Sequence, residues 1–214
     1  MMPFLRRYKH AVPTELRICF NIDFYKHFVP TRLIFMTENR EKEWRNLQAS
    51  AQQMLDNPRL LPKDLQIRQF SQTLHLWISP TFTPEKHWVF NEPQPQINPQ
   101  PKPIVQQMIW QREADFQRFR NSPEGFQIEP TFEIETIEIE WEFYRKLRAE
   151  LSKIQLPPFL DVEMSGRDGE IFGVETLDYF YSGRIIWWSD YPEEWKDLVD
   201  WYEKVRKFLE DFFN

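Results

Sequence analysis

Four histidines are the side chains of this sequence best suited to proton transfer or metal binding: His10, His27, His75 and His87. No two of them lie at the spacing of a metal-binding motif, and no cysteine pairs with them. His75 and His87 lie on two segments that resemble the strands of one hairpin, so they can face each other as a general base or a ligand pair. Partial burial with hydrogen bonds is the commoner role for such residues. We expect no bound transition metal.

Carboxylates gather in the last third of the chain, at Asp161, Glu163, Asp168, Glu170, Glu175 and Asp178. Hard cations prefer oxygen ligands, so a metal-dependent hydrolase is one hypothesis for this group. A nuclease-type site would also place a lysine two residues after a strand glutamate, but Leu177 stands at that position after Glu175. An acidic, solvated face of a sheet is the simpler interpretation.

Several other chemistries lack their signature. All five glycines lie at or after Gly125, which excludes a glycine-rich phosphate-binding loop from the first half. No G-x-S-x-G motif occurs, and Cys19 lies in an apolar run typical of a buried thiol. We therefore assign no catalytic residue and expect no cofactor.

The charge of the chain is unevenly distributed. Residues 1–128 carry 17 basic against 12 acidic side chains, a net of +5, whereas residues 129–214 carry 10 against 21, a net of −11. Basic and aromatic residues alternate near the N-terminus, so a nucleic-acid-binding accessory protein is a further hypothesis. The small positive excess and the absence of a known binding motif favour an ordinary surface.

Trp187 and Trp188 are the candidate partner-binding residues. On a strand, two successive side chains point to opposite faces, so one indole can pack under a helix while the other faces solvent, the first half or a partner. Exposed tryptophan is a preferred anchor of protein interfaces. Coverage of the second indole within the chain is the alternative.

The elements that position these residues are clearest in the C-terminal part. Alternating patterns and Gly-containing turns predict three antiparallel strands at 160–164, 171–176 and 184–189. Asp190, Pro192 and Glu193 are typical of a helix start, and apolar residues at helical spacing follow as far as Phe213.

Earlier elements are predicted by the same periodicities. Strands are expected at 16–24, 32–36, 74–78, 88–90 and 126–135. Helices are expected from a cap at Thr37 or Asn39 to Asn57, over 104–120, and over 137–154.

Residues 91–103 contain five prolines and no apolar face, which is typical of an extended spacer. We therefore predict an α+β protein of two small sub-domains, 1–91 and 104–214, joined by a Pro/Gln-rich linker at 92–103. The second would be a three-stranded antiparallel meander packed by two long helices. A long surface loop within one domain is the alternative for the linker.

No apolar run approaches the roughly 18 residues of a membrane span, and no secretory signal follows the N-terminal arginines. With a single cysteine, these features favour a soluble cytoplasmic protein. Abundant aromatic residues and the lack of a catalytic motif favour a non-enzymatic protein-binding or adaptor role, with a protein as partner in a hetero- or homo-oligomer.

Overall fold

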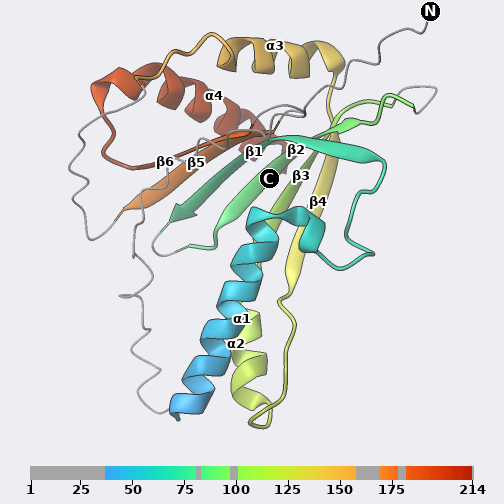
Figure 1. Cartoon of the computed structure of the whole chain (residues 1–214), viewed down its shortest axis with the longest axis vertical. Helices are drawn as coiled ribbons and strands as arrows, with labels where there is room; N and C mark the ends of the chain where they lie inside the picture. The colour runs from blue at the N-terminus through green and yellow to red at the C-terminus, as the bar shows by residue number, and fades with distance from the viewer. Residues whose placement is uncertain (1–36, 81–82, 97–100, 158–168, 178–181, 214) are drawn as a thin grey trace, which may run out of the picture.

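The computed structural model describes residues 37–80, 83–96, 101–157, 169–177 and 182–213. Six antiparallel strands form one sheet in the order β4-β3-β2-β1-β5-β6 (Figure 1). The strands are β1 (Phe70–Pro80), β2 (Lys86–Pro93), β3 (Ile104–Trp110), β4 (Phe132–Glu138), β5 (Glu170–Leu177) and β6 (Ser182–Trp188). The helices are α1 (Glu38–Asp56), α2 (Arg112–Asn121), α3 (Trp141–Leu151) and α4 (Lys196–Phe213), with short 3₁₀ turns η3 (Pro58–Leu60) and η4 (Glu193–Trp195). The α+β class is confirmed.

Strand β1 is the centre of the sheet. It pairs with β2 on one side and with β5 on the other, where Trp77 lies opposite Gly173. The sheet therefore runs without interruption from strands of the first half to strands of the second, and it does not confirm two sub-domains. The predicted linker begins within β2 and ends where β3 starts, so it connects two neighbouring strands.

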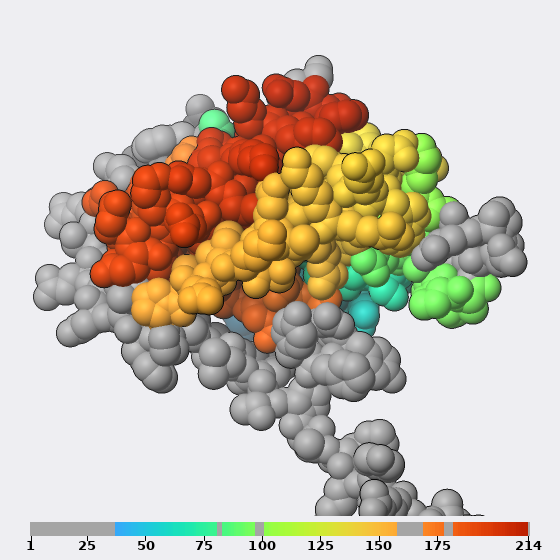
Figure 2. Space-filling model, turned by 90° about the horizontal axis from the view of Figure 1, so that it is seen from above, coloured from blue at the N-terminus to red at the C-terminus, as the bar shows by residue number. Residues whose placement is uncertain are grey.

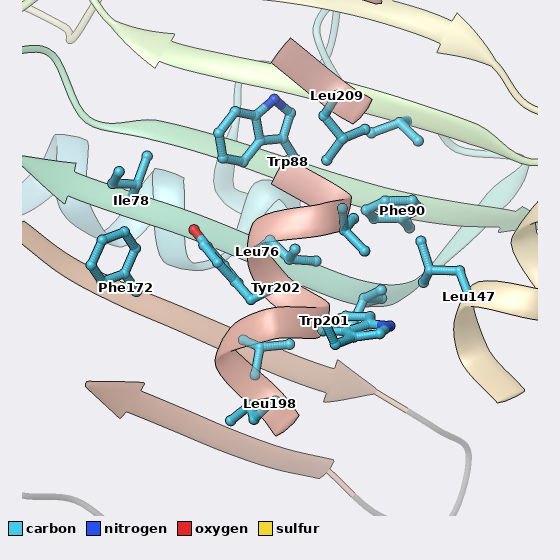
Figure 3. Close-up of a cluster of buried hydrophobic side chains, with 14 of the residues drawn as sticks. Leu76, Ile78, Trp88, Phe90, Leu147, Phe172, Leu198, Trp201, Tyr202 and Leu209 are labelled. Carbon is cyan, nitrogen blue, oxygen red and sulfur yellow. The ribbon is translucent and has the colours of Figure 1, made fainter. Parts of the chain in front are cut away.

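Helices α3 and α4 cover one face of the sheet (Figures 1 and 2). The main hydrophobic core lies beneath them, where apolar side chains of α4 meet those of the central strands (Figure 3). Leu198, Tyr202 and Leu209 are fully buried there, and the Tyr202 hydroxyl donates to the Trp77 carbonyl oxygen at 2.6 Å. As predicted, this C-terminal helix packs its apolar stripe on the sheet.

Helices α1 and α2 lie side by side on the opposite side of the sheet from α3 and α4 (Figure 1). Thr37 caps α1, with its hydroxyl accepting from the Arg40 amide at 3.3 Å, as the sequence predicts. Trp44 packs against Phe116 and Phe119 of α2. Nearer the sheet, Leu55 and Leu61 join Val89 and Met108 in a second cluster.

Two predicted helices differ from the structure. The helix expected over 104–120 is wrong in its first half, since Ile104–Trp110 forms β3 and only Arg112–Asn121 is helical. The strand expected over 126–135 and the helix expected over 137–154 are both displaced: the strand covers Phe132–Glu138 and the helix covers Trp141–Leu151. In both cases hydrogen bonding to a neighbouring strand outweighs a local helical pattern, as Val105 pairs with Ile137.

The hairpins at 74–78 with 88–90 and at 171–176 with 184–189 are confirmed by β1–β2 and β5–β6. The strands expected at 16–24, 32–36 and 160–164 lie outside the described residues, so a three-stranded meander is not confirmed. Within the described ranges, no helix combines the length and the apolar run needed to cross a membrane.

Candidate functional site: a buried histidine pair between two glutamates

The hairpin β1–β2 brings His75 and His87 into direct contact, as the sequence suggests. His75 Nε2 and His87 Nδ1 are 2.8 Å apart, and both side chains are fully buried. His87 Nε2 lies 2.8 Å from a Glu85 carboxylate oxygen, and His75 Nδ1 lies 3.7 Å from Glu175. The four side chains form a line from Glu85 through both rings to Glu175.

The strand register explains this contact. His75 lies opposite Val89, and His87 lies opposite Trp77, so the two histidines are diagonal neighbours on adjacent strands. Leu74, Leu76, Trp88 and Phe90 fill the face under α3 and α4. Side-chain alternation therefore places both histidines on the face of α1.

One arrangement of protons satisfies both short contacts. His87 Nε2–H donates to Glu85, and His75 Nε2–H donates to His87 Nδ1. His75 Nδ1 then carries no proton, which agrees with its having no hydrogen-bond partner among the described residues. In this arrangement His75 is neutral.

The electrostatics favour a neutral His75. Burial lowers the pKa of His75 from 6.5 to about 4, and His87 adds to the lowering, while Glu175 and Asp56 act in the opposite direction. Burial alone would raise the pKa of Glu85, but its contacts with His87 and Gln52 bring it below the usual value. Glu85 is therefore the negative end of the line.

An ion pair and an aromatic ring surround the Glu175 end of the line. Arg184 of β6 donates to Asp56 at the end of α1, at 2.9 Å, and its guanidinium lies 4.5 Å from the centre of the Trp77 ring. Trp77 lies flat across Gly173, where an added Cβ would come within 1.9 Å of the indole. Glycine at this position is therefore required by the close approach of the ring.

The pair is poorly suited to catalysis or to metal binding. Its ring nitrogens contact each other, whereas zinc would sit between them with each nitrogen about 2.0–2.1 Å from the metal. In the described part of the chain, no group of three or more histidine, cysteine or acidic side chains could hold a metal ion. Neither histidine reaches solvent, so neither can take a proton from a substrate directly.

The carboxylates noted in the sequence do not come together on one face where they are described. Glu175 lies beside His75, and Glu170, five residues earlier on β5, projects to the face of α4. Asp161, Glu163, Asp168 and Asp178 lie outside the described residues.

Both candidate partner-binding tryptophans are buried. Trp187 stacks on Phe172 and meets the edge of Tyr202 in the main core. Trp188 projects to the other face and is 9% exposed, close to Gly169. A partner-binding role for the pair stays a prediction, whereas the packing role of Trp187 is evident.

A separate groove lies between α1 and the segment 125–130. Its volume is about 620 Å³, and Leu47, Met54 and Phe119 contribute to its walls. Leu60 and Phe126 at this groove are 51% and 60% exposed, unusually high for large apolar side chains. Sequence reasoning missed this groove because its two walls are about 70 residues apart in the chain.

Sequence reasoning also missed Glu85, Trp77 and Arg184 around the histidine pair. Glu85 could have been found, because it directly precedes β2 and an extended chain places a residue two positions before His87 on the same side. Arg184 and Asp56 had no local signal, since they are 128 residues apart and meet only through the sheet.

Comparison with known proteins identifies no relative: no protein-family model, no curated protein and no solved structure matches this chain.

The free energy of unfolding is expected to fall by roughly 3 kcal/mol between pH 6.5 and pH 4. Folding lowers the pKa of His75 from 6.5 to about 4, and each pKa unit is worth about 1.4 kcal/mol. Unfolded His75 takes up a proton near pH 6.5, but folded His75 does so only near pH 4. The pKa of Glu85 is also lowered in the folded protein, so its protonation at more acidic pH should reduce the free energy of unfolding further.

Urea unfolding across this pH range measures the effect, and His75→Gln is the matched variant. The amide can still donate to His87 but does not titrate, so the slope of stability against pH should flatten. Equal slopes for the variant and the parent would show that His75 is not the group responsible.

Proposed function

We propose that the protein is a non-enzymatic binding protein that takes a peptide segment of a partner protein in the groove between α1 and residues 125–130. The observation that carries this proposal is the exposure of Leu60 and Phe126 at one hollow. Exposed apolar surface at a concave site is a common mark of protein interfaces.

The charge of the groove indicates the chemistry of the partner. Glu43 and Glu129 line it, and among the described lining residues there is no lysine or arginine. Glu43 is paired with Arg40 at 3.0 Å, so Glu129 is the main negative charge open to a partner. Glu43 also accepts from the Gly125 amide at 3.0 Å, which ties the segment 125–130 to α1. A segment with apolar side chains flanked by lysine or arginine complements this surface.

The other two hypotheses have less support. A hydrolase would need clustered carboxylates, yet Glu170 and Glu175 project to opposite faces of the sheet. A nucleic-acid-binding role rests on basic residues near the N-terminus, which lie outside the described residues. The division into sub-domains 1–91 and 104–214 and the cytoplasmic location also stay predictions.

Selection from a displayed library of random peptides on the purified full chain tests the proposal. We expect enriched peptides to carry apolar residues flanked by basic ones, and their affinity to fall with salt. Phe126→Ala should weaken binding about tenfold or more, as expected for an aromatic contact residue.

Phe212→Ala is the matched control, because Phe212 is also exposed, at 57%, but lies on α4 away from the groove. Affinity should be unchanged in this variant. Failure to enrich any such peptide, or equal losses in both variants, would overturn the proposal.

A further inference from the structure

A second hollow lies between the sheet and the segment that follows α1. Its volume is about 310 Å³, within the usual range of small-molecule sites. The floor is formed by β1, β2 and β3, and the roof is formed by residues 58–70. We call it the amide cavity because Gln72, Asn91 and Gln106 line it. It is distinct from the peptide groove and from the histidine pair.

The floor of the amide cavity carries three amide side chains from three adjacent strands. Gln72 lies opposite Asn91 in the register of β1 and β2, and Gln106 of β3 lies opposite Val89. Gln106 is only 5% exposed and lines the cavity, and no hydrogen bond of its side-chain amide is found among the described residues. A group that enters the cavity can therefore pair with this amide without breaking a hydrogen bond of the protein.

The roof of the cavity is held in place by hydrogen bonds. The Gln66 amide donates to the carbonyl oxygens of Arg59 and Leu61, at 2.9 and 2.6 Å. The backbone N–H of Gln94 donates to the Gln69 carbonyl oxygen at 3.0 Å. This hydrogen bond holds the roof against the end of β2. A roof fixed in this way needs little ordering when a ligand binds.

The charge of the cavity selects an anion. Arg59 and Arg68 line it and are both exposed, so they can reach over its opening. The described lining residues include no carboxylate. Arginine binds phosphate through two parallel N–H groups.

We infer that the amide cavity binds a small organic anion with a planar ring edged by hydrogen-bonding groups, of which a nucleoside monophosphate is the simplest class. Gln72, Asn91 and Gln106 offer both donors and acceptors, the combination that recognises the edge of a base. The apolar side chains of Leu61 and Leu65 provide a surface for the ring, and the two arginines hold the phosphate.

Calorimetry of the full chain with AMP, GMP, CMP and UMP tests this inference, with the nucleosides and inorganic phosphate as comparison probes. At least one monophosphate should bind more tightly than its nucleoside and than phosphate. Gln106→Leu, which keeps the size of the side chain, should lower that affinity about tenfold.

The double variant Arg59→Gln/Arg68→Gln changes exposed side chains and provides an independent test if Gln106→Leu fails to fold. It should weaken the monophosphate strongly and the nucleoside little. Arg45→Gln is the control, since Arg45 is an exposed arginine of α1 paired with Glu41 outside the cavity, and it should change nothing. No binding by any of the four monophosphates at millimolar concentration, equal binding of inorganic phosphate, or binding unaffected by both cavity variants would overturn the inference.

Discussion

A fragment that begins at Ile104 is expected to stay unfolded when it is expressed alone. It would lack β1 and β2, which lie between β3–β4 and β5–β6, so its four strands would form two separate pairs. It would also lack Leu76, Trp88 and Phe90, against which α4 packs (Figure 3). Isolated strand pairs are at best marginally stable in water.

Circular dichroism and urea unfolding of the fragment, with the full chain as control, measure this effect. A full chain cut by protease within 92–103 should keep its two pieces together in native gel filtration, because β2 and β3 remain paired. Cooperative unfolding of the isolated fragment would instead support the two sub-domains that the sequence suggests.

Leu209→Ala is expected to lower the free energy of unfolding by about 2–5 kcal/mol. The side chain is fully buried between α4 and the sheet, so its loss leaves a cavity that the surrounding residues fill only in part. Urea unfolding of the variant gives the difference.

Phe212→Ala is the control on the same helix. Phe212 is 57% exposed, so its loss should cost far less than the loss of Leu209 even though more atoms are removed. Similar losses for the two variants would show that the buried face of α4 is not the one assigned.

The parts of the fold that could be predicted are those with strong local signals. Thr37 is a cap followed by a helical stripe that includes Trp44 and Leu55, and the structure has α1 in that place. The apolar stripe of α4 and the hairpins β1–β2 and β5–β6 are likewise set by nearby residues.

The parts that could not be predicted depend on distant partners. Ile104–Trp110 has helical spacing, but it lies between β2 and β4. It pairs with β4 along its whole length and with β2 as far as Ile109. The pairing of β1 with β5 joins segments about 100 residues apart, and no local pattern indicates it.

The candidate site likewise has a part that local sequence predicts and a part that depends on distant residues. The contact between His75 and His87 follows from the hairpin and could be predicted. Its outer groups could not, because Arg184 and Asp56 come from opposite ends of the described chain and meet only when the sheet is complete. The two hollows depend in the same way on segments brought together by the fold.

His75 is sealed inside the sheet and stays neutral at ordinary pH, which argues against proton transfer at the histidine pair. Nuclear magnetic resonance of the imidazole nitrogens during a pH titration tests it most directly. We predict that His75 stays neutral, with its proton on Nε2, until the pH approaches 4. Titration of His75 near pH 6.5, or rapid exchange of its ring proton with water, would show that His75 is accessible to protons and restore the pair as a candidate catalytic site.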